Sequence, residues 1–98
     1  MIHDTEDTTA EAHLFHALGN PIRLRVLLTL DEPMPVHDLN EIISSYPDSK
    51  LSYHLSLLAK RGLVTRTPRG NLRIYRRTAL GDAIAFVVLL YRAVRGRR

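Results

Sequence analysis

Apolar residues recur at helical spacing over five stretches of the chain, and each stretch ends at a capping or helix-breaking residue. The spacing predicts helices over residues 9–18, 21–30, 36–45, 49–61 and 79–94. Asn20 and Pro21 suit the N-cap and first position of the second helix, and Thr78 suits the N-cap of the last. Gly62 follows the fourth helix, where a left-handed C-cap residue is expected.

The apolar positions also indicate which helix faces are buried. Apolar residues surround most of the axis of the second helix, which predicts a central position in the core. In the fourth helix Leu51, Leu55 and Leu58 follow at spacings of four and three, so one face is expected to pack against the third helix. The third helix is expected to bury Val36, Leu39, Ile42 and Ile43.

Two short strands are predicted between the fourth and the last helix, over residues 63–67 and 72–77. Residues 68–71, Pro-Arg-Gly-Asn, have the composition of a hairpin tip. In the second strand Leu72 and Ile74 alternate with Arg73, Tyr75 and Arg77, which predicts one buried and one basic face. Residues 44–48 are expected to form a short turn, so two helices joined by a turn precede a hairpin. This order predicts a mainly α fold with a small β-hairpin, a winged helix-turn-helix.

The 98 residues allow one domain, expected over residues 9–94, with a flexible arm at 1–8 and a basic tail at 95–98. The chain has no cysteine, which excludes disulfides and thiolate metal sites. Its longest apolar run, residues 83–91, is shorter than the ~20 residues that a membrane-spanning helix needs. We therefore expect a cytoplasmic protein without a membrane partner.

Charge is distributed very unevenly along the chain. Residues 1–59 carry nine acidic and three basic residues, whereas residues 60–98 carry eleven basic residues and the single acid Asp82. The formal charges are therefore −6 and +10, which sum to the net +4 of the chain. A solvated charged face is the simplest interpretation of a charge run, but an excess of this size favours a polyanionic partner such as double-stranded DNA.

Two segments of the sequence resemble the ArsR/SmtB family of transcriptional repressors. Residues 52–64, SYHLSLLAKRGLV, are similar to that family's S-x-H-L-x-x-L-x-x-x-G-L-V signature. Residues 18–27, LGNPIRLRVL, are similar to its L-x-(D/N)-P-x-R-x-x-I-L segment, and Gly70 and Ile74-Tyr75 fit its wing. The resemblance covers about residues 14–78 and implies a DNA-binding regulator, most often a repressor.

Candidate DNA contacts follow from the helix period and from this resemblance. The N-terminal half of a recognition helix enters the major groove, so we expect base contacts from the polar residues outside the leucine face, namely Ser49, Lys50, Ser52, Tyr53 and Ser56. Backbone contacts are expected from the basic residues Lys60, Arg61, Arg66, Arg69 and Arg73, with Arg76 and Arg77 as more generic contributors. For His54 a structural or phosphate-facing role is favoured over a metal role.

The metal-sensing residues of the family are missing from the sequence. Where the arsenic and cadmium sensors carry two cysteines, this chain has Pro35 and His37, and one imidazole cannot form a site of three or four ligands. The zinc sensors use Asp and His on the last helix, where this chain has only Asp82. His13 and His16 share a helix face, and ordinary surface histidines are favoured over a weak metal site. We therefore expect no cofactor and no metal response, and leave open an organic effector, a protein effector or none.

The last helix is apolar nearly all round, which predicts that it is either central in the monomer or packed between its own core and a second copy. The second arrangement is favoured, with a homodimer interface formed by Leu80, Ile84, Val87, Val88, Leu90 and Tyr91, and with a contribution from the first helix that the resemblance implies. A protein-binding module with incidental or non-specific DNA binding is the alternative function. An enzyme is not expected, because there is no Gly-rich phosphate loop and no nucleophile with a paired base.

Overall fold

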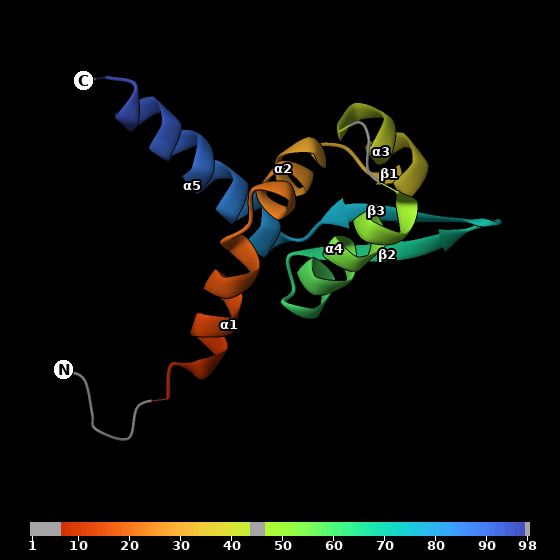
Figure 1. The fold of residues 1–98 in the computed structure, drawn as a ribbon, viewed down its shortest axis with the longest axis horizontal. Helices are drawn as coiled ribbons and strands as arrows, with labels where there is room; N and C mark the ends of the chain where they lie inside the picture. Colours follow the sequence, from red (N-terminus) through yellow and green to blue (C-terminus); the bar gives the residue numbers. More distant parts are fainter. Residues whose placement is uncertain (1–6, 44–46, 98) are drawn as a thin grey trace.

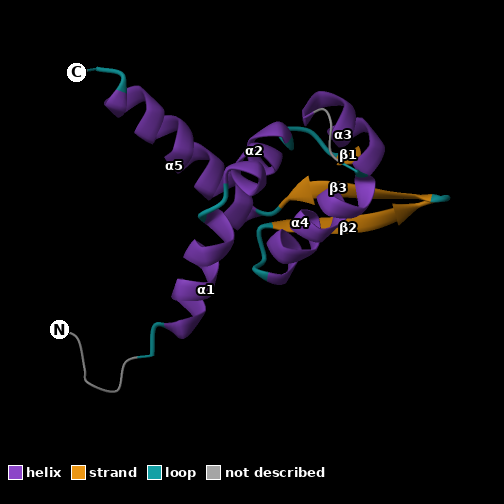
Figure 2. Cartoon of the chain, in the orientation of Figure 1, coloured by secondary structure: helices purple, strands orange, loops and turns teal. Residues whose placement is uncertain are grey.

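The computed structural model describes residues 7–43 and 47–97 as five helices and a three-stranded antiparallel sheet. The helices are α1 (Thr9–Leu18), α2 (Pro21–Thr29), α3 (Val36–Ile43), α4 (Asp48–Lys60) and α5 (Ala79–Arg95). The strands are β1 (Met34–Pro35), β2 (Val64–Arg69) and β3 (Leu72–Arg77), in the order β1-β3-β2 (Figure 2). The predicted winged helix-turn-helix is confirmed.

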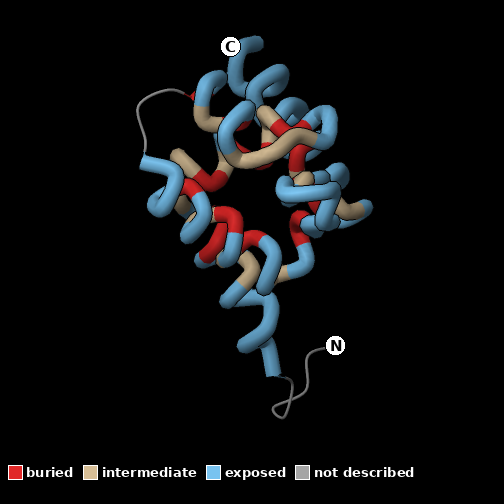
Figure 3. The backbone as a smooth tube through the Cα atoms, turned by 90° about the vertical axis from the view of Figure 1, so that its right-hand side faces the viewer, coloured by how far each residue is buried: buried red, intermediate tan, exposed pale blue. Residues whose placement is uncertain are grey.

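The core lies where α2, α3 and α4 meet the base of the β2–β3 hairpin, and the buried segments gather around the centre of the molecule (Figure 3). Burial of one leucine side chain in this core contributes about 1.5–3 kcal/mol to the free energy of folding. The buried side chains therefore hold the three helices together. The predicted central position of α2 and the predicted leucine face of α4 are confirmed. The core side chains with no exposed surface are Val26, Leu27, Leu39, Leu51, Leu55, Leu58 and Leu63.

The helix ends have the caps that the sequence predicts. The Asn20 side chain accepts hydrogen bonds from the backbone N–H groups of Ile22 and Arg23, and the Thr78 hydroxyl accepts one from Gly81. Gly62 has φ +77°, the left-handed conformation that ends α4. These caps satisfy N–H groups that an α-helix leaves unpaired at its start.

Two predicted burial positions are wrong. Ile42 is 57% exposed, because Leu39 and Ile43 are the positions of α3 that face the core. In β3 the buried residue is Tyr75, at 5% exposure, whereas Leu72 is 53% exposed. The strand does alternate, but its inner face carries Tyr75 and Arg77 and its outer face carries Leu72, Ile74 and Arg76. Leu72 lies next to the hairpin turn, away from the core, whereas Tyr75 belongs to the core cluster.

The hairpin is longer and its turn is tighter than predicted. Pro68 and Arg69 belong to β2, and Arg69 pairs with Leu72, which leaves Gly70-Asn71 as a two-residue turn with Gly70 at φ +61°. The segment expected to break the second helix contains β1, which pairs antiparallel with β3, Met34 against Tyr75 and Pro35 against Ile74. This strand is missing from the sequence prediction.

Helices α1 and α5 extend from one side of the domain, and the hairpin projects from the opposite side (Figure 1). The buried residues of α5 are Gly81 and Ala85. The long apolar helix is therefore neither central nor enclosed within one copy of the chain.

Parts of four predicted segments lie outside the described residues. They are residues 1–6 of the predicted arm, residues 44 and 45 of the predicted third helix, residues 44–46 of the predicted turn and Arg98 of the predicted tail. Asp48, which was expected in the turn, is the first residue of α4.

Candidate nucleic-acid interface

Helix α4 carries a polar face opposite its buried leucines. Leu51, Leu55 and Leu58 have no exposed surface and pack against α2 and α3. The residues on the other side are exposed, and Tyr53 is the largest of them, at 61%. The structure therefore places all the candidate base-contacting residues on the exposed side of one helix, with Ser49, Lys50, Ser52 and Tyr53 in its N-terminal half and Ser56 just beyond the midpoint.

The β2–β3 hairpin forms an arginine-rich wing beside this helix. Arg66, Arg69 and Arg73 are exposed, and their pairing partners in the ladder are Tyr75, Leu72 and Pro68. Arg76 is exposed as well. The described part of the wing contains no acidic residue, so it forms a positively charged edge next to α4.

Lys60 and Arg61 lie apart from the candidate base contacts. They are at the C-terminal end of α4, where they line a hollow with Glu11 and Leu14 of α1 and Leu80 of α5. Ten residues of helix, about 15 Å, separate Lys60 from Lys50. The predicted backbone contacts therefore fall into two separate groups, one on the wing and one beside α1.

Arg77 is bound inside the protein instead of facing solvent with the other wing arginines. Its Nε donates to Asp82 Oδ1 over 2.9 Å, and its Nη1 donates to the Leu27 carbonyl oxygen over 3.1 Å. These contacts join β3 to α5 and α2. Arg77 is thus a structural residue, whereas the sequence treats it as one more phosphate contact.

A buried arginine that is not among the predicted site residues joins α1, α2 and α4. Arg23 is 6% exposed, and its Nε donates to the Ala17 carbonyl oxygen over 2.7 Å. Its Nη1 lies 3.2 Å from His54 Nδ1, so of the two roles left open for His54, structural or phosphate-facing, this contact supports the structural one. Burial and the positive charges of Arg23 and Lys50 lower the pKa of His54. The His54 ring also meets the Tyr53 ring edge-on, at 5.6 Å between centroids.

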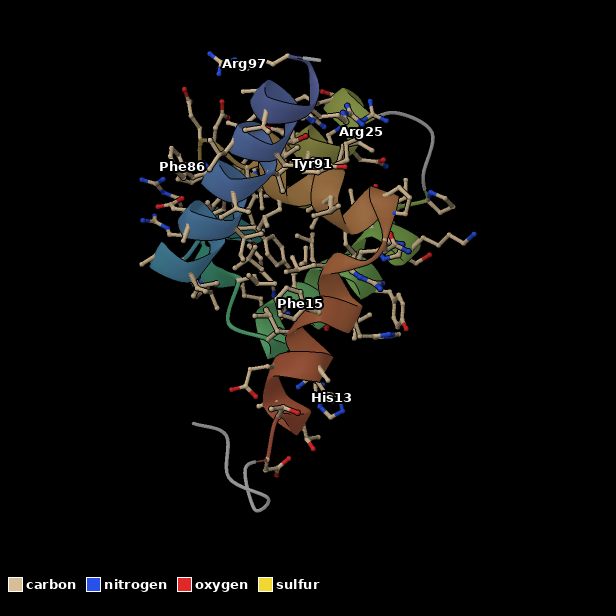
Figure 4. The ribbon with its side chains drawn as sticks, turned by 90° about the vertical axis from the view of Figure 1, so that its left-hand side faces the viewer. His13, Phe15, Arg25, Phe86, Tyr91 and Arg97 are labelled. Carbon is tan, nitrogen blue, oxygen red and sulfur yellow. The ribbon has the colours of Figure 1, made fainter. Side chains whose placement is uncertain are left out.

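Helix α5 presents a large apolar surface, and α1 adds to it. Within the predicted interface Val87, Leu90 and Tyr91 are at least half exposed, Leu80 is 41% exposed, and Ile84 and Val88 are half-buried. Phe86 and Tyr91 lie on opposite sides of α5, and Phe15 of α1 is on the same side of the domain as Tyr91 (Figure 4). The exposed apolar residues that the sequence prediction leaves out are Phe15, Phe86, Leu89 and Val94.

The histidines do not form a metal-ligand cluster in the described part of the chain. Within residues 7–43 and 47–97, no three His, Asp or Glu side chains are close enough to hold a metal ion. His37 Nε2 lies 3.5 Å from Glu41 Oε2 on the exposed side of α3.

Within residues 7–43 and 47–97, no helix is both long and apolar enough to cross a membrane.

Known proteins share this sequence and this fold. Residues 18–67, about half of the chain, match the family model described as a helix-turn-helix domain. A Halobacterium salinarum protein, named as the ArsR repressor of an arsenical resistance operon, is 35% identical over 78 residues. That match covers 76% of this chain and 60% of the relative, so the chain spans less than two thirds of the relative's length.

Solved structures agree with the sequence match. Rv0081 of Mycobacterium tuberculosis has a TM-score of 0.76 at 30% identity, over 91% of this chain and 88% of its own. NolR of Sinorhizobium fredii has a TM-score of 0.74 at 28% identity, over 83% of this chain and 82% of its own. From the family model, the archaeal relative and the shared fold together, the chain belongs to the ArsR-type family of winged helix-turn-helix transcriptional regulators.

Proposed function

We propose that the chain is a homodimeric, sequence-specific DNA-binding repressor that occupies an inverted-repeat operator. The observation that supports this most is the polar, exposed N-terminal half of α4 beside the arginine-rich wing. Polar side chains on such a helix can contact base edges in the major groove, and wing arginines suit the phosphates or a narrow minor groove. The archaeal relative is itself named as a repressor.

The dimer in this proposal is formed by α5 and α1. Leu80, Val87 and Tyr91 are exposed on one side of α5, and burying them against a second copy removes apolar surface from water. Small domains bury only ~60% of the surface that their unfolded chains expose, so a partner adds to a marginal core. A twofold axis would place the two α4 helices about one turn of DNA apart, which selects an inverted repeat.

We also propose that neither of the two metal sites of the family operates here. Pro35 of β1 and His37 of α3 occupy the positions of the family's two cysteines, and Asp82 is the only candidate ligand found on α5. Addition of Zn²⁺ or arsenite to the DNA complex should leave its affinity unchanged. Release of DNA by either ion would contradict this part of the proposal.

Selection of bound duplexes from a random DNA pool tests the proposal most directly. We expect an inverted repeat with half-sites about one helical turn apart. If about six phosphates are neutralised, the logarithm of affinity should fall against the logarithm of salt with a slope of about −5. Weak, sequence-blind binding would refute the sequence-specific repressor and favour a protein-interaction module. A flat salt dependence would refute the phosphate contacts altogether.

A further inference from the structure

A hollow of about 340 Å³ lies between the recognition helix and the wing. Its lining comes from three parts of the chain that are far apart in sequence: the start of α3, the middle of α4 and the tip of the hairpin. A water molecule takes up only ~30 Å³ in the liquid, so the hollow is large enough for a bulkier group.

One part of the lining consists of hydrogen-bond donors. They are His37 of α3, Ser52 of α4, and Asn71 and Arg73 of the wing. Within residues 7–43 and 47–97, the side chains of Ser52, Asn71 and Arg73 make no hydrogen bond or ion pair with another residue. These three side chains are therefore available to a bound group, and no acidic residue lines the hollow with them. His37 differs from them, because its Nε2 lies 3.5 Å from the Glu41 carboxylate.

The rest of the lining is apolar. Val36 and Tyr75 form a wall on the protein side, and Leu72 is 53% exposed at the edge nearest the hairpin turn. A free inorganic anion has no apolar surface that could pack against this wall. A deoxyribose ring with its phosphate matches both parts, since the sugar can pack against apolar carbons while the phosphate oxygens accept hydrogen bonds.

The position of the hollow also favours a deoxyribose-phosphate unit as the ligand. In duplex DNA one sugar-phosphate strand separates each major groove from the neighbouring minor groove. A protein that places α4 in the major groove and the wing at the minor groove must therefore accommodate that strand between them. We propose that the hollow is a backbone-binding site for one phosphodiester of the operator strand that passes between α4 and the wing, held by Ser52, Asn71, Arg73 and His37.

This proposal rests on the proposed function, because it requires DNA on α4. It adds His37 and Asn71 to the interface, and it moves Ser52 from base recognition to backbone recognition. Contacts to the backbone fix the register of a protein on DNA but carry no direct sequence information. Loss of any of these side chains should therefore weaken binding to every DNA sequence by the same factor.

The test combines protein variants with a chemically altered duplex. The probe is the duplex that the wild-type protein selects from a random pool, with one phosphate at a time replaced by an uncharged methylphosphonate. Arg73→Ala should lower affinity about tenfold, and Asn71→Ala and His37→Ala about threefold each, as expected for one charged and two neutral hydrogen bonds. Arg73→Ala should also reduce the salt slope by about one.

One methylphosphonate position in each half-site should weaken wild-type binding, and should cause a smaller loss in the Arg73→Ala and Asn71→Ala proteins, because part of the contact to that phosphate is already missing from them. Arg97→Ala, at the end of the chain beyond α5, is the matched control and should retain the full loss (Figure 4). Thermal melting should be unchanged in all of these variants, because each replaced side chain is exposed.

If the losses of affinity caused by the protein variant and by the methylphosphonate were additive at every phosphate position, the proposed backbone site would be refuted. The proposed DNA-binding function would not be affected by that result. A change of base preference in Asn71→Ala or His37→Ala would overturn the backbone site too, in favour of base recognition. Failure of the wild-type protein to select any duplex would refute the proposed function itself.

Discussion

Arg23 and His54 are joined by a contact of 3.2 Å between Nη1 and Nδ1, although 31 positions separate them in the chain. The same guanidinium binds the Ala17 carbonyl oxygen near the end of α1. One buried side chain on α2 thus connects a helix of the proposed dimer face to the helix that carries the candidate base contacts. The orientation of α1 relative to α4 depends on it.

Replacement of Arg23 with Met should destabilise the fold by about 2–3 kcal/mol, because it leaves a buried carbonyl oxygen and His54 Nδ1 without their donor. Urea unfolding monitored by circular dichroism measures this. Arg25→Met, two residues away on the exposed side of α2, is the control and should change stability by less than about 0.5 kcal/mol. Equal effects of the two substitutions would show that the Arg23 contacts contribute nothing.

Stability should also depend on pH through His54. Its pKa is lowered from 6.5, chiefly by burial and then by the charges of Arg23 and Lys50. The unfolded chain therefore binds this proton at a higher pH than the folded protein does, and the free energy of unfolding should fall as the pH drops below about 6.5. The fall should end once the pH is below the folded pKa.

Urea unfolding of the wild type and of His54→Gln between pH 7.5 and pH 5 tests this dependence, since glutamine can still accept a hydrogen bond and does not titrate. The variant should lose less stability than the wild type over that range, and parallel curves would contradict the prediction. Asp7, whose pKa is lowered from 3.8 by hydrogen bonds from Thr9, acts only at lower pH and does not interfere.

Two glycines should respond to alanine substitution in different degrees. A Cβ at Gly81 would collide with the Leu63 carbonyl oxygen and crowd Arg77, so Gly81→Ala should push α5 away from β3 and cost about 2–3 kcal/mol. A Cβ at Gly62 would meet nothing within 4 Å, so Gly62→Ala should cost only the strain of φ +77°, about 1 kcal/mol. Thermal unfolding of both variants decides this, and the reverse order would mean that α5 can shift without penalty.

The two sides of α5 should differ in their importance for assembly. Val87 belongs to the predicted interface on the side of Tyr91, whereas Phe86 lines a hollow with Leu28 of α2 on the other side. Val87→Asp should yield monomers with strongly reduced DNA binding, and Phe86→Asp should remain dimeric. Analytical ultracentrifugation measures the assembly, and a dimeric Val87→Asp protein would refute this interface.

Much of the fold could be predicted because its signals are local. The four-and-three spacing of Leu51, Leu55 and Leu58 defines the buried face of α4, and Asn20-Pro21 marks the start of α2 in adjacent residues. β1 could not be predicted, since two residues, one of them proline, are too short to show an alternating pattern. In β3 both faces carry apolar side chains, so alternation alone could not decide between Leu72 and Tyr75.

The candidate site, too, could be predicted from the sequence only in part. The helix period is enough to place Ser49, Ser52 and Tyr53 together on one exposed face. The Arg23–His54 contact and the hollow between α4 and the wing depend on which elements pack together, and no short-range pattern contains that information.

The pairing of β1 with β3 has a consequence for how the protein meets its ligand. Met34 and Pro35 lead directly into α3 and are held against Tyr75 and Ile74 of the wing. This short ladder joins the start of α3 to the hairpin, so we expect the spacing between the helices and the wing to change little when DNA binds. A preorganised site loses little conformational entropy on binding, and duplexes then differ in how readily their groove widths adapt to it. Sequence preference would in that case arise partly from the stiffness of the DNA, at base pairs that no side chain touches.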